Sequence, residues 1–335
     1  MTKKDNGVTR QGATPYSERA RRRSYFNGVA LGVLAAAVLG LYMLASTGSQ
    51  GDTTAQVARY APNPDRVIRV QKQDGIEMVN SSKKLFSVFT SQGYSLDEVR
   101  RGERAVPRLY VVSLPGDLHK LNSVQDRKIV FIKTMLPLIL RANEDIRATR
   151  ARLTTLRKQL EAGTALSGDD RAWLDKIFWQ YRVKDDDMNV LMRRVDTVPA
   201  SLALAQAAEE SGWGTSRFAQ EGNALFGQWT TAEGEGLVPR RREAEASHKV
   251  RVFDELHDAV AAYLHNLNTH RAYRQFRLTR AEQRAESGRL DSVALVEDLK
   301  SYSERGEDYV ASIKTIIRVN RLRQLDQAAF DSPSA

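Results

Sequence analysis

Residues 197–214 read TVPASLALAQAAEESGWG, and this stretch predicts a buried helix that ends in two carboxylates. The helix begins near Pro199, because proline is well tolerated in the first helical turn. Between positions 200 and 208 only Ser201 and Gln206 are polar. Since a helix that is apolar on nearly every side is normally buried, this one is predicted to lie inside a mainly helical domain.

Glu209 and Glu210 occupy the last turn of this helix, just before Gly212, a common helix terminator. The partial negative charge of the helix end disfavours a carboxylate there by roughly 0.3–1 kcal/mol and raises its pKa. Neighbouring helical residues point about 100° apart, so one glutamate is expected to face a cleft and the other to pack or meet solvent. A carboxylic acid held protonated beside an indole suits general acid catalysis of glycosidic-bond cleavage. The alternative is a chance pair on a solvated helix end.

Hydrophobic periodicity predicts further helices on both sides of this stretch. They are expected at residues 126–140 with a kink at Pro137, 143–161, 168–181, 254–270, 292–302 and 308–325. Short β-rich runs at 67–70 and 109–112 predict strands, and 249–253 alternates as a hairpin strand would. The predicted fold is therefore mainly α, with a small β-hairpin lobe after the acidic helix.

The beginning of the chain carries a membrane signal. Residues 28–46 hold no charged side chain over 19 positions, close to the ~20 needed to cross a bilayer. Basic residues 19–23 precede this run, so a cytoplasmic tail (1–27), one transmembrane helix (28–46) and a linker (47–65) are predicted. A cleaved signal peptide is the competing interpretation, since small residues follow the apolar run.

Composition argues against several kinds of site and partner. The chain has 335 residues, a formal net charge of +10 and no cysteine, so it has neither disulfides nor thiolate metal ligands. His265 and His270 are five positions apart, whereas helical chelates use a spacing of four, so no metal and no cofactor is expected. Export across the membrane would separate the body from nucleic acid, and an anionic envelope polymer is the expected partner. The oligomeric state is left open.

Five segments together resemble the glucosaminidase family, glycoside hydrolase family 73, in its Bax-like branch. They are LALAQAAEESGWGTSRFAQEGNALFGQW (202–229), NLNTHRAYRQFR (266–277), SYSERGEDYVASIKTIIRVNRL (301–322) and, upstream, VPRLYVVSLP with RKIVFIKTMLPLILRANEDI. The resemblance covers roughly residues 105–325. It implies a lysozyme-like α fold that acts on peptidoglycan or a related N-acetylglucosamine polymer.

The same resemblance implies a set of site residues. The catalytic glutamate precedes Ser-Gly-Trp-Gly and therefore falls on Glu210, which leaves Glu209 as its structural neighbour. The implied substrate-binding residues are Trp213, Asn223, Phe226, Gln228, Trp229 and Tyr302. Plain core packing is the alternative for the aromatic residues, and for Asn223 and Gln228 it is the tying of a turn by local hydrogen bonds.

A second carboxylate is expected in the β excursion, where it would activate water or support an oxocarbenium-like state. Glu243 is the first choice, because it lies between the turn at 238–240 and the following strand. Glu233, Glu235, Glu245 and Asp254 compete with it. The substrate's own acetamide is a further alternative.

These inferences predict an accessory region (66–185), a catalytic domain (186–328) and an endo-β-N-acetylglucosaminidase activity on β-1,4 bonds of the cell wall. The expected location is the bacterial inner membrane, with the N-terminus in the cytoplasm and the catalytic domain in the periplasm. A lytic transglycosylase and a non-catalytic glycan-binding or scaffold protein are the alternative functions.

Overall fold

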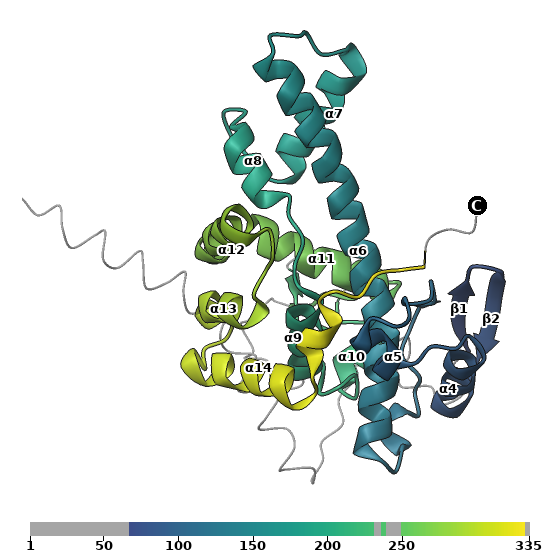
Figure 1. Ribbon diagram of the computed structural model, residues 1–335. Coiled ribbons are helices and arrows are strands. Elements are labelled where there is room, and N and C mark those ends of the chain that lie inside the picture. The colour runs from purple at the N-terminus through teal and green to yellow at the C-terminus, as the bar shows by residue number, and fades with distance from the viewer. Residues whose placement is uncertain (1–66, 231–235, 239–248, 332–335) are drawn as a thin grey trace, which may run out of the picture.

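A computed structural model describes residues 67–230, 236–238 and 249–331 (Figure 1). The described chain is mainly helical and carries one three-stranded and one two-stranded sheet. The predicted mainly α class with a small β-hairpin is confirmed, and the architecture fits a lysozyme-like α fold.

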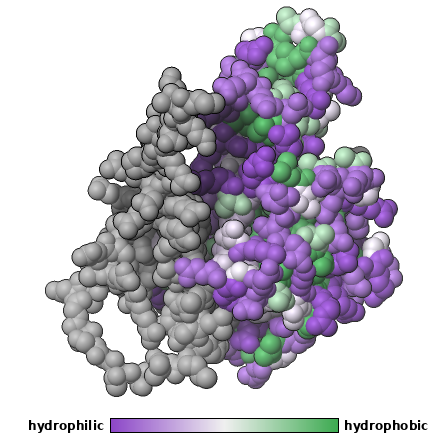
Figure 2. Space-filling model, turned by 90° about the vertical axis from the view of Figure 1, so that its left-hand side faces the viewer, coloured by the Kyte–Doolittle hydropathy of each residue, from purple (hydrophilic) through white to green (hydrophobic). Residues whose placement is uncertain are grey.

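Within the described ranges, no helix is both long and apolar enough to cross a membrane. The predicted span at 28–46 lies outside these ranges. On the face shown in Figure 2, hydrophilic residues cover most of the described surface, and the hydrophobic ones form small separate patches.

The first part of the described chain is a small α/β unit. Strands β1 (Ile68–Lys72), β2 (Gly75–Val79) and β3 (Tyr110–Val111) form an antiparallel sheet in the order β2-β1-β3. Helices α4 (Ser82–Ser91) and α5 (Leu96–Arg101) follow β2, and the short helix η2 (Leu118–Lys120) follows β3. The strands predicted at 67–70 and 109–112 are confirmed, and they pair with each other.

Helix α6 (Val124–Glu161) runs for 38 residues through Pro137. The predicted division into two helices at 126–140 and 143–161 is therefore wrong. Pro137 removes the amide that would bond to the carbonyl of Lys133, at a cost of about 3 kcal/mol in an ordinary helix interior. Every residue from 130 to 140 is buried, so packing on all sides holds the helix together across the proline. The second half of α6 projects from the body together with α7 (Gly168–Gln180), the helix predicted at 168–181 (Figure 1).

The remaining helices surround α9 (Ala200–Ser211), which packs against α6, α14 and η5. They are α8 (Met188–Arg194), α10 (Arg217–Gly222), α11 (Leu256–Thr269), η3 (Arg271–Tyr273), α12 (Arg274–Ser287), α13 (Ser292–Val296), η4 (Glu297–Tyr302), α14 (Glu307–Val319) and η5 (Leu322–Leu325). One contiguous core runs from Ile68 to Leu325 and includes both faces of α9. Residues 200–208 are all buried, as the apolar composition of this helix predicts.

The predicted β excursion is a short hairpin. Strand β4 (Trp229–Thr230) pairs with β5 (Lys249–Val250), and Leu237 forms a bridge to Val250. Beyond β5 the chain stays attached, because Arg251 donates its amide to the Gln228 carbonyl and Phe253 to the Gly222 carbonyl. The hairpin is therefore fixed at its base, next to the end of α10.

Candidate active site

Helix α9 is held at its beginning by residues from distant parts of the chain. Pro199 is the N-cap and supplies no side-chain hydrogen bond. The carboxylate of Asp326 takes this role, accepting from the Ser201 amide and from its hydroxyl, both at 2.8 Å. The Asn143 amide on α6 pairs with the backbone of Val198 at 2.8 and 3.1 Å. Both contacts fix the start of α9, and hence the position of the carboxylates at its other end.

The helix ends in an unusual turn of three consecutive residues with positive φ. Gly212, Trp213 and Gly214 have φ of +57°, +58° and +79°. The Gly214 amide donates to the Ser211 hydroxyl at 2.8 Å, and the Trp213 amide donates to the Ala208 carbonyl at 2.8 Å. Trp213 therefore holds a left-handed conformation that costs a non-glycine residue roughly 1–2 kcal/mol.

Gly214 is also required by packing. A Cβ atom on it would lie 2.7 Å from Leu114 Cδ1 and 3.0 Å from Phe131 Cδ2, which is closer than real contacts allow. The Ser-Gly-Trp-Gly sequence is thus explained by the turn itself. The Ser211 hydroxyl accepts a hydrogen bond within the turn, and the two glycines adopt its positive φ angles without strain. The Trp213 ring packs edge-on against Phe131, with ring centroids 5.7 Å apart.

The two neighbouring glutamates enter different surroundings. Glu209 forms an ion pair with Arg305, with Nη1 2.6 Å from Oε1. Glu210 faces a group of tyrosines, and burial is the main cause that raises its pKa from 4.5 to about 7. The charge of Glu209 raises it further, whereas a hydrogen bond from Tyr309 and the charge of Arg305 lower it. The direction agrees with the sequence prediction, but the main cause is desolvation and not the helix end.

Four tyrosines and one phenylalanine form the wall around Glu210. Phe226 stacks on Tyr263 at 3.9 Å, and Tyr302 stacks on Tyr309 at 5.5 Å. Tyr273 lies 5.9 Å from Tyr302. Burial raises the pKa of all four tyrosines, and the charge of Glu210 raises it further. These residues come from α11, η3, η4 and α14, which converge on the end of α9.

A hydrogen-bond chain leads through this wall to Glu210. The Tyr263 hydroxyl donates to Gln206 Oε1, and Gln206 Nε2 donates to the Tyr309 hydroxyl at 2.7 Å. Since Tyr309 accepts from Gln206, its own proton is left for Glu210, with which it is hydrogen-bonded. These hydrogen bonds orient the Tyr309 hydroxyl as a donor toward the Glu210 carboxyl and stabilise the ionised form of Glu210.

Sequence reasoning missed Tyr263, Tyr273, Tyr309 and the role of Gln206. One signal was available, since Gln206 lies four residues before Glu210 and therefore on the same helix face. A polar side chain in an otherwise apolar helix needs a buried partner. The identity of that partner was not visible, because Tyr263 and Tyr309 come from helices far along the chain.

Of the residues expected to bind substrate, two lie in the wall of Glu210 and the others make different contacts. Phe226 and Tyr302 belong to the wall of Glu210, and the half-buried Tyr302 donates to the Phe226 carbonyl at 3.3 Å. Trp213 packs on Phe131, and the Lys128 ammonium lies 4.8 Å from its ring centroid. Asn223, only 2% exposed, is a left-handed cap of α10.

Asn223 joins the end of α10 to the segment after β5, whereas its alternative interpretation predicted local hydrogen bonds within its own turn. Its amide donates to the carbonyls of Phe253 and Asp254, both at 3.0 Å. Gln228 and Trp229 are half-buried at the base of the hairpin. A substrate contact of any of these residues stays a prediction.

The second carboxylate is not located. Glu243, the first choice, and its competitors Glu233, Glu235 and Glu245 lie outside the described residues. Asp254 is described, and its side chain is exposed. Over the part of the chain that the structure describes, no group of three histidine, cysteine or acidic side chains is arranged to hold a metal ion.

A central, buried helix that presents a protonatable glutamic acid to an aromatic wall is typical of glycoside hydrolases with a lysozyme-like α fold. Residues 186–322 match the glucosaminidase family, described as mannosyl-glycoprotein endo-beta-N-acetylglucosaminidase. Protein bax of Escherichia coli (strain K12) is 36% identical over 206 residues, which cover 59% of this chain and 70% of that protein. The chain belongs to the glucosaminidase family and is Bax-like, as its motifs predicted. No solved structure matches it.

Proposed function

We propose that this protein is a membrane-anchored peptidoglycan hydrolase that cleaves β-1,4 glycosidic bonds at N-acetylglucosamine, with Glu210 as the general acid. The observation that carries the proposal is the pKa of Glu210, which burial raises to about 7. A carboxyl group with this pKa is largely protonated at slightly acidic pH and keeps its proton in a substantial fraction of molecules at neutral pH, as proton donation to a leaving oxygen requires. Family membership supports the glycoside hydrolase class and a glycan substrate.

In this mechanism Glu210 gives its proton to the glycosidic oxygen as the bond breaks. The tyrosine wall keeps water away from the carboxyl before the step, which maintains the raised pKa. After the step the Tyr309 hydroxyl donates to the new carboxylate and stabilises its charge. A second carboxylate, for which Glu243 is the first choice, or the substrate's acetamide stabilises the positive charge on the sugar. Water then adds to the anomeric carbon and gives its proton to a carboxylate, which completes the hydrolysis.

A lytic transglycosylase is the second candidate, and one observation favours keeping it. That class needs only one carboxyl group. The neighbouring Glu209 forms an ion pair with Arg305 at 2.6 Å, so Glu210 is the one carboxyl group of this pair that is left for catalysis. Products separate the two: hydrolysis leaves a reducing-end N-acetylglucosamine, whereas transglycosylation leaves an anhydro-muramic end.

A non-catalytic glycan-binding or scaffold protein is the third candidate. If this candidate is right, neither the wild type nor a Glu210 variant cleaves any covalent bond in peptidoglycan. Digestion of purified peptidoglycan by the full chain in detergent, followed by mass spectrometry, tests all three candidates. Glu210→Gln should abolish product formation, and Glu243→Gln should reduce it if that residue supplies the second carboxylate.

The proposed location is the bacterial inner membrane, with one span at 28–46 and the catalytic domain in the periplasm. The uncharged run and the basic residues that precede it support this orientation. Protease added outside spheroplasts should degrade the domain and leave a short membrane-embedded fragment. Recovery of the whole protein in the soluble fraction would contradict the anchor.

A further inference from the structure

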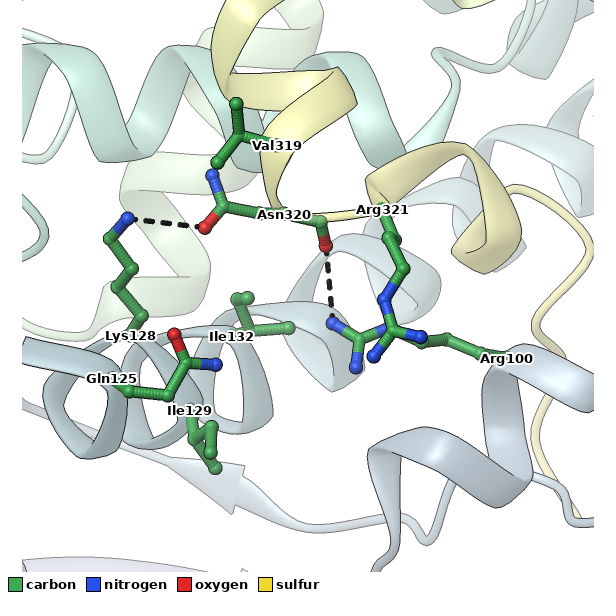
Figure 3. A pocket seen from close by; sticks show the side chains of 8 residues that line it. All are labelled: Arg100, Gln125, Lys128, Ile129, Ile132, Val319, Asn320 and Arg321. Atoms are coloured by element: carbon green, nitrogen blue, oxygen red, sulfur yellow. Dashed lines mark hydrogen bonds between the residues drawn. The ribbon is translucent and has the colours of Figure 1, made fainter.

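A basic groove lies away from Glu210, between α4, α5, the first turns of α6 and the C-terminal end of α14. It consists of two adjoining cavities of about 160 and 470 Å³, which share Arg100, Gln125, Ile129 and Arg321 in their walls. Figure 3 shows the smaller one, with Lys128 and Asn320 on one side and the side chains of Arg100 and Arg321 on the other. We call the two cavities together the basic groove.

The groove has more positive than negative side chains. Its walls contain five basic residues, which are Arg100, Arg104, Lys128, Lys133 and Arg321, and two acidic ones, which are Asp97 and Glu98. Both acidic residues are already paired. Asp97 Oδ1 accepts from Arg100 at 3.0 Å and from Arg321 at 3.3 Å, and Glu98 pairs with Arg104 at 2.9 Å. Lys128 and Lys133 therefore have no carboxylate partner among the described residues.

Lys133 is the most unusual of these residues. It is only 7% exposed, and its ammonium lies 5.1 to 5.8 Å from the ring centroids of Phe86, Tyr94 and Phe89. Burying an ammonium is costly unless a counter-charge or hydrogen bonds compensate for lost water. Burial lowers the pKa of Lys133, against a weaker effect of Asp97.

Two further polar atoms in the groove are also unpartnered. The Tyr94 hydroxyl and Arg100 Nε are buried and have no hydrogen-bond partner within the described ranges. Tyr94 is 2% exposed and, like Lys133, lines the larger cavity. Neither of these two atoms is accessible from the cavity, so the donors that match the acceptor oxygens of a bound carboxylate are those of Lys128 and the exposed Arg321 on the groove walls.

The groove and the active site share neighbouring residues on two elements. Lys128 lines the smaller cavity and also lies over the ring of Trp213, three residues after Glu210. Along α14, Tyr309 contacts the Glu210 site and Asn320 lines the groove. These two positions are separated by roughly 16 Å of helix at about 1.5 Å per residue. An extended peptide covers such a span in about five residues.

We propose that the basic groove binds a carboxylate of the peptide branch attached to the glycan strand, and so selects strands that still carry peptides. This rests on the proposed peptidoglycan substrate. A peptide suits the groove better than a phosphate group does, because the groove places apolar side chains beside its basic ones. The apolar walls formed by Phe86 and Ile129 accommodate short aliphatic side chains.

The test measures binding apart from catalysis. The full chain carrying Glu210→Gln is titrated, by calorimetry, with peptides released from peptidoglycan by an amidase. Lys133→Met and Arg321→Gln are introduced separately, and Arg323→Gln is the matched control on the same short helix, where Arg323 pairs with Asp291 at 3.4 Å. The groove variants should weaken peptide binding tenfold or more, and the control should stay within twofold. Because Arg321 is exposed, its variant remains informative if Lys133→Met fails to fold.

Equal peptide affinity in the parent, Arg321→Gln and the control would overturn the proposal. Binding to phosphatidylglycerol vesicles in place of peptide, lost in the groove variants, would also overturn it and indicate a lipid site. With Glu210 intact, glycan strands stripped of peptides should be cleaved equally by wild type and Arg321→Gln. If wild type cleaves neither substrate, the proposed function fails, whatever the peptide titration shows.

Discussion

Arg305 pairs with Glu209 and not with Glu210, its guanidinium Nη1 lying 2.6 Å from Glu209 Oε1. The ion pair neutralises the Glu209 carboxylate. Glu210, one residue later, is surrounded by Tyr263, Tyr302 and Tyr309 and has a pKa of about 7. The difference between two adjacent glutamates thus comes from the elements that pack on each side of α9.

The first prediction concerns the two charges beside Glu210, which should move the pH dependence in opposite directions. Glu209→Gln removes a negative charge that raises the pKa of Glu210, so the alkaline limb of kcat/KM should shift to lower pH. Arg305→Gln removes a positive charge that lowers this pKa, so the limb should shift to higher pH. A pH profile of glycan cleavage checks both, and shifts in the same direction would contradict the assignment.

The second prediction concerns Tyr309. Its hydrogen bond lowers the pKa of Glu210, so Tyr309→Phe should move the alkaline limb upward. The rate plateau should fall about tenfold, because a hydrogen bond to a charged group contributes about 1.5–3 kcal/mol. Tyr181→Phe is the control, since Tyr181 is buried against His265. An unchanged pH profile for Tyr309→Phe would show that Tyr309 does not influence the ionisation of Glu210.

The third prediction concerns stability. The folded-state pKa of Glu210 is raised above the unfolded value of 4.5, so its ionisation opposes folding as the pH rises from 4.5 through about 7. Glu210→Gln abolishes this effect and should stabilise the protein by about 3 kcal/mol at pH 8, relative to the difference at pH 4. Denaturant unfolding of both proteins at the two pH values measures it. A difference independent of pH would argue against the raised pKa.

The fourth prediction concerns the turn after Glu210. Gly214→Ala places a Cβ 2.7 Å from Leu114 Cδ1 at a φ of +79°, and should cost about 2–4 kcal/mol. Gly212→Ala meets only Thr215 Oγ1 at 3.4 Å, so it should cost about 1–2 kcal/mol from backbone strain alone. Thermal unfolding of the two variants compares these costs. Equal losses would show that packing at Gly214 is not decisive.

Much of the fold followed from local sequence patterns. The apolar helix at 200–211, the strands near 68–72 and 110–111, and most later helices were predicted by periodicity. Helix α5 was missed although Ser95 and Glu98 form a recognisable capping sequence, in which Ser95 Oγ accepts from the Glu98 amide at 3.3 Å. The break predicted between residues 140 and 143 is wrong, because α6 is buried throughout residues 130–140 and continues as one helix from Val124 to Glu161.

The site was only partly predictable, since its decisive contacts join distant residues. Asp326 caps α9 by binding Ser201, which lies 125 positions earlier in the sequence. Arg305 pairs with Glu209, which lies 96 positions earlier. Local propensity contains no information on such pairs. The resemblance supplied the proposed assignment of Glu210 as the acid, and the structure adds the surroundings that raise its pKa.

The most direct test of the central claim is mass spectrometry of peptidoglycan digested by the full chain and by its Glu210→Gln variant. The account predicts fragments with reducing-end N-acetylglucosamine from the wild type and none from the variant. Equal digestion by the variant would contradict the role of Glu210, and anhydro-muramic ends from the wild type would contradict hydrolysis.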